Sequence, residues 1–220
     1  MAREQNLQRV IECGLVAVVR FADPGPLVNV LKAIADGGIT VAEVTFTVPD
    51  ALGVIREAKR QLGDRVLLGA GTVLDAETAR AAILAGAEFL VSPAVNVDVI
   101  RMARRYDKLV MPGAFTPTEI LTAWEAGADI VKVFPADILS PAFFRAMRGP
   151  LPQVKLMPTG GVDLTTAGEY LKAGAVCLGV GGQLVDAKLV TTGNFNAIRD
   201  LAKQYVDAVR YARSELNKKS

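Results

Sequence analysis

The chain has 220 residues, of which 51% are hydrophobic and 22% charged, and its formal net charge is +2. This is the composition of a globular protein with one large domain or two small ones, and so small a charge argues against a nucleic-acid partner. The chain contains no histidine, so the commonest acid/base residue is excluded, and chemistry must rest on lysine, carboxylates, hydroxyls or backbone groups.

The sequence gives no sign of a membrane partner. The longest stretch without an acidic or basic residue, from Ala173 to Val185, is broken by glycines and is shorter than the roughly 20 residues that cross a bilayer. Residues 1–10 contain no apolar signal core. We therefore expect a cytoplasmic protein.

Eight short β-rich runs recur along the chain, separated by amphipathic segments long enough for helices. They cover residues 15–19, 39–46, 66–68, 89–92, 109–111, 130–134, 155–157 and 176–180. Strands that alternate with helices predict parallel βαβ units, and eight units fit a closed (β/α)8 barrel. No linker divides the chain. We predict one α/β domain over residues 1–220, a TIM barrel with a short N-terminal helix and a closing C-terminal helix over about 194–213.

Lys132 interrupts an apolar run on the sixth predicted strand. Side chains alternate along a barrel strand, so Ile130, Lys132 and Phe134 share one face while Val131 and Val133 share the other. Because the valines suit the helix layer, we predict that Lys132 points into the lumen. A desolvated lysine loses its charge readily and becomes a nucleophile toward carbonyls.

Glu43 is a second charged residue at the centre of a predicted strand. It lies on the second predicted strand, where it shares a face with Val41, Thr45 and Thr47. Strands 2 and 6 lie opposite each other in a ring of eight, and lumen layers are built from alternate strands. Glu43 and Lys132 can therefore occupy neighbouring lumen positions, an arrangement typical of Schiff-base chemistry. A buried ion pair with a purely structural role is the alternative.

Two glycine pairs, Gly160–Gly161 and Gly181–Gly182, follow the last two predicted strands. Loops at these positions form the usual phosphate site of this fold, where backbone N–H groups and a short helix N-terminus hold the anion. Ordinary tight turns are the alternative. Arg20, at the end of the first strand, is either a ligand for a carboxylate or phosphate or a solvated charge.

Seven segments together resemble the class I 2-keto-3-deoxy-6-phosphogluconate (KDPG) / 4-hydroxy-2-oxoglutarate (KHG) aldolase family over about residues 8–210. They are residues 43–50 (EVTFTVPD), 69–73 (GAGTV), 91–93 (VSP), 111–113 (MPG), 132–135 (KVFP), 158–161 (PTGG) and 179–182 (GVGG). The resemblance implies a carbon–carbon lyase that needs no metal or other cofactor and binds a small-molecule substrate, usually as a homotrimer of barrels.

The resemblance also implies roles for individual residues. Lys132 would form the Schiff base and Glu43 would be the acid/base. Thr72, its neighbouring backbone and Arg20 would hold the substrate carboxylate, with Thr47 standing where some family members have arginine.

Further residues would shape the rest of the pocket. Pro93 and Phe134 would line it, and the phosphate site would be lined by Gly160, Gly161, Gly181 and Gly182. Many family members have serine where this chain has Gly182, so the resemblance implies a phosphate site with one hydroxyl fewer.

The implied reaction cleaves KDPG to pyruvate and D-glyceraldehyde 3-phosphate, and 4-hydroxy-2-oxoglutarate would give pyruvate and glyoxylate. Because a permanently ionised Glu43 would keep Lys132 protonated, we expect no tight ion pair between them, but contact through water. Two alternatives stay open: a sugar-phosphate isomerase or epimerase with Glu43 as base, and a catalytically silent barrel that acts as an assembly subunit.

Overall fold

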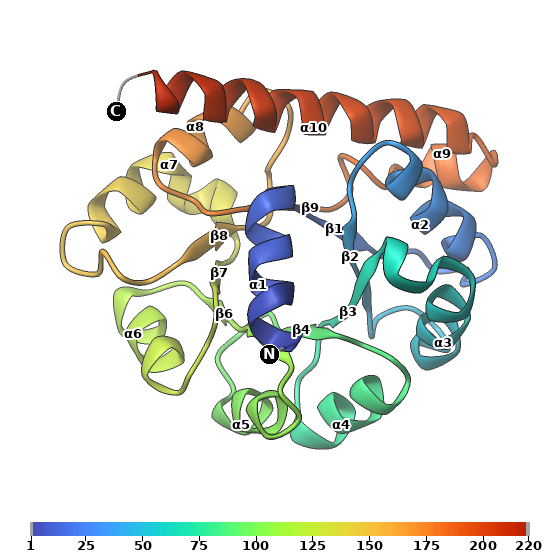
Figure 1. The fold of residues 1–220 in the computed structure, drawn as a ribbon, viewed down its shortest axis with the longest axis horizontal. Coiled ribbons are helices and arrows are strands. Elements are labelled where there is room, and N and C mark those ends of the chain that lie inside the picture. Colours follow the sequence, from blue (N-terminus) through green and yellow to red (C-terminus); the bar gives the residue numbers. More distant parts are fainter. Residues whose placement is uncertain (1, 219–220) are drawn as a thin grey trace.

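The computed structural model describes residues 2–218, in which helices surround a curled parallel sheet (Figure 1). The strands are β1 (Leu15–Val19), β2 (Val41–Thr45), β3 (Leu67–Gly71), β4 (Phe89–Val91), β5 (Leu109–Met111), β6 (Gly113–Ala114), β7 (Val131–Val133), β8 (Leu156–Pro158) and β9 (Leu178–Val180). The helices are α1 (Ala2–Cys13), α2 (Leu27–Asp36), α3 (Ala51–Leu62), α4 (Ala76–Leu84), α5 (Val97–Arg105), α6 (Pro117–Glu125), α7 (Ala136–Met147), α8 (Ala167–Lys172), α9 (Ala187–Thr191) and α10 (Phe195–Asn217), with a 3-10 turn at Gly63–Arg65. The predicted α/β fold with parallel strands is confirmed.

Hydrogen bonding divides the strands into two groups. Six strands pair in the order β5-β4-β3-β2-β1-β9, and three pair in the order β6-β7-β8, all of them parallel. Only Pro112, which has no N–H to donate to a ladder, separates β5 from β6. The fifth predicted strand therefore continues past its expected end at residue 111, in two pieces.

Element bounds differ modestly from the predicted ones. The run 39–46 forms a strand only over Val41–Thr45, and the run 176–180 only over Leu178–Val180. The closing helix is longer than expected: α10 starts after Asn194, whose side chain accepts a hydrogen bond from the Ala197 N–H, and ends at Asn217. Among the described helices, none combines the length and apolarity of a membrane-spanning segment.

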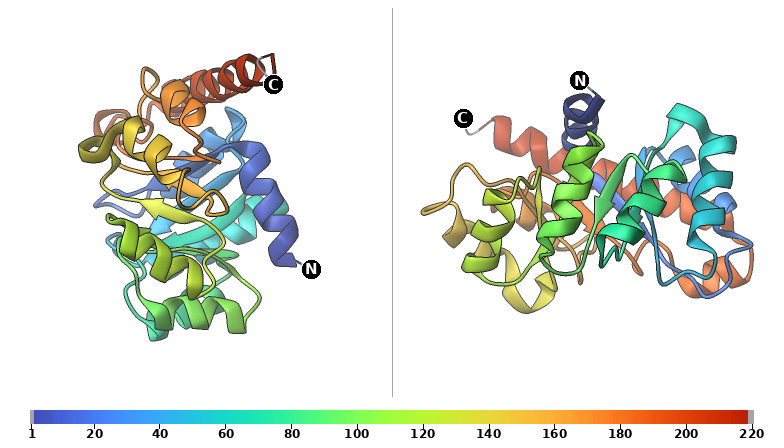
Figure 2. Two further views of the ribbon diagram at one scale, coloured as in Figure 1. Left: turned by 90° about the vertical axis from the view of Figure 1, so that its left-hand side faces the viewer. Right: turned by 90° about the horizontal axis from the view of Figure 1, so that it is seen from below.

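Two apolar clusters lie on the two sides of the sheet. The outer cluster, between strands and helices, includes Val131 and Val133. The inner cluster consists of Val10, Val16, Val41, Leu67, Phe89, Val91, Leu109, Met111, Ile130, Met157 and Cys177. Val10 belongs to α1, which lies across the amino ends of the strands (Figures 1 and 2). The predicted faces of the sixth strand are therefore confirmed, because Ile130 packs inside and both valines pack outside.

Candidate active site

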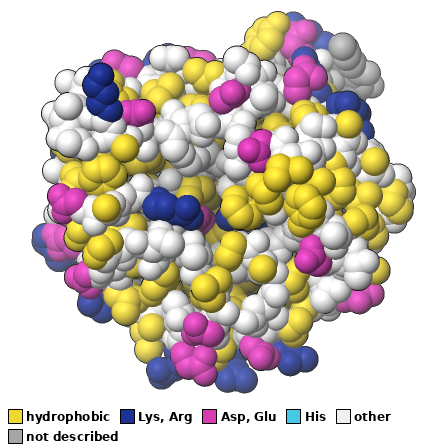
Figure 3. Space-filling view, turned by 180° about the vertical axis from the view of Figure 1, so that it is seen from behind, with side chains coloured by type: hydrophobic (Ala, Val, Ile, Leu, Met, Phe, Trp, Pro, Cys, Tyr) yellow, Lys and Arg dark blue, Asp and Glu magenta, His cyan; other side chains and the backbone are white. Residues whose placement is uncertain are grey.

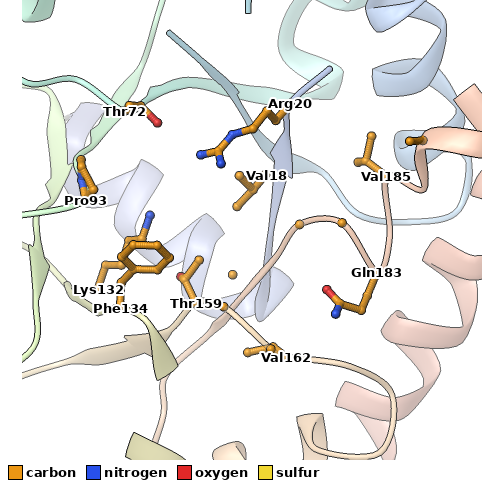
Figure 4. Close-up of a pocket in the computed structure, with 16 residues that line it drawn as sticks. Val18, Arg20, Thr72, Pro93, Lys132, Phe134, Thr159, Val162, Gln183 and Val185 are labelled. Atoms are coloured by element: carbon orange, nitrogen blue, oxygen red, sulfur yellow. The ribbon is translucent and has the colours of Figure 1, made fainter. Parts of the chain in front are cut away.

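A pocket of about 480 Å³ lies at the carboxyl ends of the strands. In the view from the side opposite α1, it is a hollow that contains a basic side chain (Figure 3). Its lining consists of Val18, Arg20, Thr72, Pro93, Lys132, Phe134, Thr159, Gly160, Gly161, Val162, Gly179, Gly181, Gly182, Gln183, Val185 and Ala187 (Figure 4). All predicted site residues except Glu43 and Thr47 are among them. Within residues 2–218, no group of three or more Cys, Asp or Glu side chains is placed to hold a metal ion.

Lys132 lies in the middle of β7, where its backbone pairs with β6 and β8. The residue is only 7% exposed, and its Nζ lies 4.9 Å from the centre of the Phe134 ring. Burial lowers the pKa of Lys132, the nearby Glu43 carboxylate raises it, and the Arg20 guanidinium lowers it again. Because burial is the largest of these causes, this amine gives up its proton more readily than an exposed lysine does.

Glu43 lies in the middle of β2 and is 1% exposed. Burial raises the pKa of Glu43, whereas Lys132 and Arg20 lower it, and burial is the largest cause. A Cβ atom on Gly71 would lie 2.4 Å from Oε1 of Glu43, so the glycine makes room for the carboxylate. Among the described residues, Oε2 has no hydrogen-bond partner. An unpaired buried oxygen of this kind is available to a water or a substrate.

Glu43 and Lys132 are neighbours without a direct bond. The described contacts include neither a hydrogen bond nor an ion pair between them, as expected from the sequence, although each shifts the pKa of the other. An ion pair with a structural role would need its charged atoms in contact to offset the free-energy cost of burial. The charged atoms of these two groups are therefore not committed to each other, and Lys132 lines the pocket.

Arg20 and Thr72 border the pocket near Lys132. Figure 4 shows the Arg20 guanidinium extending from the end of β1 toward Thr72 and Lys132. Thr72 has a φ of 58°, a left-handed conformation that is rare for a β-branched residue and costs about 1–3 kcal/mol. The next residue, Val73, fixes this turn because it is buried and donates its N–H to the Val91 carbonyl at 3.1 Å. A guanidinium and a hydroxyl beside the amine suit a carboxylate.

Glycine turns form the other end of the pocket. Gly160 and Gly161 have φ values of 91° and 69°, which glycine adopts without strain. Among the described residues, the N–H groups of Gly161, Val162, Gly182 and Gln183 donate to no protein acceptor. These main-chain donors are therefore available to an anion.

Carboxylates of the protein accept hydrogen bonds from main-chain N–H groups at the start of α9 and in the turn before α8. Asp163 accepts hydrogen bonds from two N–H groups in the turn before α8. Asp186 accepts hydrogen bonds from the Lys188 and Leu189 N–H groups at the start of α9. The available donors lie in the glycine turns, and Ala187, the first residue of α9, also lines the pocket. The expected contribution of a short helix N-terminus stays a prediction.

Two predicted residues lie outside the pocket lining. Glu43 is buried close to Lys132, within range of its charge. Thr47 is exposed, and its hydroxyl lies 2.8 Å from that of Thr45. The structure therefore brings Glu43, but not Thr47, to the group around Lys132.

Two polar lining residues were not predicted, Thr159 and Gln183. Thr159 is 6% exposed, and its Oγ1 has no hydrogen-bond partner among the described residues. A Cβ atom on Gly179 would lie 2.2 Å from this oxygen. The position of Thr159, two residues after the inward-facing Met157, is the signal by which strand alternation could have identified it.

The sequence pattern described as KDPG and KHG aldolase matches residues 7–201. The 2-dehydro-3-deoxy-phosphogluconate aldolase of Treponema pallidum is 36% identical over 206 residues, which are 93% of this chain and 96% of that protein.

Two solved structures resemble this chain in fold over most of its length. A KDPG aldolase from Legionella pneumophila, with pyruvate captured at low pH as a covalent carbinolamine intermediate, has a TM-score of 0.84 at 26% identity, covering 90% of this chain and 96% of that one. A cube-shaped protein cage, designed by fusing symmetric oligomeric domains, has a TM-score of 0.87 at 29% identity over 94% of this chain and 75% of that one.

Proposed function

The chain belongs to the KDPG and KHG aldolase family, and from this membership we infer that it is a carbon–carbon lyase that cleaves KDPG to pyruvate and D-glyceraldehyde 3-phosphate. Neither an isomerase nor a silent assembly subunit is favoured by these relatives. The observation that ties the activity to the pocket is the buried Lys132, whose pKa is lowered, beside a buried Glu43 with no direct bond to it.

Lys132 supplies the nucleophile in this proposal. Its neutral Nζ adds to the C2 carbonyl of the substrate, and the resulting carbinolamine loses water to form an iminium ion. An ammonium group has no lone pair for this addition, so the burial that favours the uncharged amine also favours the first step.

Glu43 moves the protons. Its carboxylate takes the proton of the C4 hydroxyl, directly or through a water, and the electrons of the C3–C4 bond move into the iminium as glyceraldehyde 3-phosphate leaves. The enamine that remains takes a proton at C3, and water then hydrolyses the iminium to release pyruvate and Lys132. Burial suits Glu43 to this exchange because it favours the protonated form more than solvent does.

The polar groups near Lys132 would orient the keto acid. We assign the substrate carboxylate to Arg20 and Thr72, which border the pocket on this side. Pro93 and Phe134 would form apolar walls. Thr47 would act only indirectly, through its hydrogen bond to Thr45.

The glycine turns would hold the phosphate at the other end. Main-chain N–H groups around Gly160, Gly161, Gly181 and Gly182 are the donors for this site. KHG is a second substrate of the same kind, because it shares the C2 ketone and the carboxylate, and the family description names both compounds.

Reductive trapping tests the proposal. The protein is incubated with pyruvate and sodium borohydride, and its peptides are examined by mass spectrometry. We expect one pyruvate-derived adduct on Lys132, together with pyruvate release from KDPG. Epimerase activity without an adduct would favour the isomerase, and no turnover of KDPG or KHG would favour the silent subunit.

We further propose that the two strand groups close into one (β/α)8 barrel that forms a single domain over residues 1–220. Support comes from both seams. At one, Pro112 accepts a hydrogen bond from the Lys132 N–H at 2.9 Å. At the other, Thr159 bridges to Gly179, and the Val176 N–H donates to Leu156 at 3.0 Å. A single cooperative unfolding transition would agree with this proposal, and two separate transitions would contradict it.

A homotrimer is the assembly we propose. Large apolar side chains stay exposed on this chain, among them Phe115, Leu121 and Ile138, and Figure 3 shows apolar side chains gathered beside the hollow. Patches of this kind mark protein interfaces. Light scattering should give three times the chain mass of 23.3 kDa; the mass of one chain would contradict the proposal.

The cytoplasmic location expected from the sequence stays a prediction.

A further inference from the structure

The polar side chains of the pocket are divided unevenly between its two ends. Arg20, Thr72 and Lys132 lie around the reacting centre, whereas Gln183 lies apart from them in the loop after β9, near Val162 (Figure 4). Within residues 2–218, Arg20 and Lys132 are the only basic side chains that line the pocket. Apart from the buried Thr159, which precedes Gly160, Gln183 is the polar side chain that adjoins the main-chain donors of the glycine end.

The loop around Gln183 fixes its backbone and leaves its side chain unused. Leu184 and Val185, the next two residues, are buried, and both donate their N–H groups to the Gly181 carbonyl at 2.9 Å. Gln183 itself is exposed, and in the described part of the chain its amide has no hydrogen-bond partner. An anchored loop that presents a free amide at a pocket is suited to ligand recognition.

The neighbouring position leaves space for this contact. A Cβ atom on Gly182 would meet no atom within 4 Å, so open space adjoins the loop on that side. Since Gly181 and Gly182 have no side chains, Gln183 is the one residue of this turn that offers a side-chain donor. An oxygen bound by the N–H groups of this turn would come within reach of the Gln183 amide.

We propose that Gln183 is a specificity-determining residue, whose side-chain Nε2 donates a hydrogen bond to a phosphate oxygen of the bound substrate. This inference rests on the proposed KDPG cleavage. A neutral amide strengthens binding of a phosphate without adding a charge, and it leaves Arg20 to the carboxylate. A hydrogen bond to a charged oxygen is stronger than one between neutral groups, so its loss affects the phosphorylated substrate selectively.

The test compares KDPG with its unphosphorylated analogue, 2-keto-3-deoxygluconate, in steady-state assays of pyruvate release. Gln183→Leu removes the donor at similar size, and Gln183→Glu replaces it with a carboxylate that repels the phosphate. We expect kcat/KM for KDPG to fall about 10-fold for Leu and about 100-fold for Glu. For the unphosphorylated analogue, kcat/KM should stay within about twofold. Gln183→Lys should keep or raise kcat/KM for KDPG, with a steeper dependence on salt.

Gln153→Glu is the matched control, because Gln153 is also exposed and in a loop, but precedes β8 at the opposite end of the strands. It should leave both substrates unchanged. Equal losses for both substrates in the Gln183 variants, or no loss for KDPG, would overturn the inference while the aldolase activity stands. A wild-type protein that turns over neither substrate would overturn the proposed function and this inference together.

Discussion

The two ends of the sheet interior are built from the same strands but differ in chemistry. Most inward-facing positions hold the apolar inner cluster, which extends to the amino ends of the strands, where α1 covers it with Val10. Toward the carboxyl ends, inward-facing positions hold Glu43 on β2 and Lys132 on β7, and a pocket adjoins them. Ile130 and Lys132 are only two residues apart, yet one belongs to the closed end and the other to the open end.

Burial has opposite effects on the free energy of folding at the two ends. Apolar side chains at the closed end stabilise the fold by about 25 cal/mol per Å² of area removed from water. At the open end, burial is the largest cause of the shifted pKa values of Glu43 and Lys132, so both charged forms are disfavoured. We therefore expect substitutions at the open end to change activity with little loss of stability, and substitutions at the closed end to do the reverse.

The largest effect on activity is expected from Lys132→Met. Methionine keeps much of the side-chain volume and removes the nucleophile, so kcat/KM for KDPG should fall about 10⁴-fold or more. The melting temperature should equal or exceed that of the wild type, because a buried amine is replaced by an apolar group. Pyruvate-release assays and scanning calorimetry measure both quantities.

Lys155→Met is the matched control. Lys155 lies just before β8, at the closed end, with its Nζ 5.8 Å from the centre of the Trp124 ring. The same substitution there should change kcat/KM by no more than about twofold. Similar losses in the two variants would show that the two ends are not chemically distinct.

A smaller loss is expected from Glu43→Gln. The amide keeps the shape of the side chain but cannot accept the C4 proton, so kcat/KM should fall about 10²- to 10⁴-fold while borohydride trapping of pyruvate persists. Glu88→Gln is the control, because Glu88 precedes β4 at the closed end and pairs with Lys108 at 2.7 Å. Loss of trapping in Glu43→Gln would place Glu43 in the carbinolamine step instead.

The same variant gives a test of stability against pH. Because the folded state raises the pKa of Glu43, it binds this proton more tightly than the unfolded chain does. The wild type therefore loses stability as the pH rises from the ordinary glutamate value of about 4.3 toward the raised pKa. Glu43→Gln lacks this loss, so its advantage in melting temperature should grow over that range and then level off. An advantage that shrinks as the pH rises would contradict the effect of burial.

The inward-facing residues at both ends could be predicted from the alternation of side chains along a strand. This alternation applies only within the bounds of the strand. Alternation placed Ile130 and Lys132 inside because both lie on or beside β7. It failed for Thr47 because β2 ends at Thr45 and a turn follows, so the period of two no longer applies. The split of the fifth strand at Pro112 was missed because the apolar run itself stops at residue 111.

Residues whose role depends on a partner across the sheet were harder to find. Threonine is common in strands, and Thr159 is distinctive only because its buried hydroxyl lies against Gly179 on β9 and has no hydrogen-bond partner among the described residues. Gln183 is a single polar residue in a loop, and its place in the pocket depends on how β9 is positioned beside β1. Such pairings between distant segments are not encoded in any local pattern.

Thr159→Val should have a moderate effect at the open end. The change removes only the unpaired hydroxyl, so kcat/KM should fall about tenfold if the hydroxyl binds substrate. The melting temperature should hold or rise slightly, because an unpaired buried hydroxyl is unfavourable. Thr122→Val is the control, since its hydroxyl bonds to the Thr118 carbonyl at 2.9 Å within α6. Unchanged activity in Thr159→Val would show that the hydroxyl has no part in the reaction.

The smallest effect on activity is expected at the closed end, from Ile130→Ala. Ile130 is fully buried in the inner cluster, and truncating it should lower the free energy of unfolding by about 2–5 kcal/mol, measured with urea. Per folded molecule, counted by borohydride trapping, kcat/KM should stay within about twofold. Val131→Ala, on the outer face of the same strand, should also destabilise without loss of activity. If kcat/KM fell in Ile130→Ala but not in Val131→Ala, and by as much as in Thr159→Val, the inner cluster would position the amine of Lys132. The two ends would then not be independent.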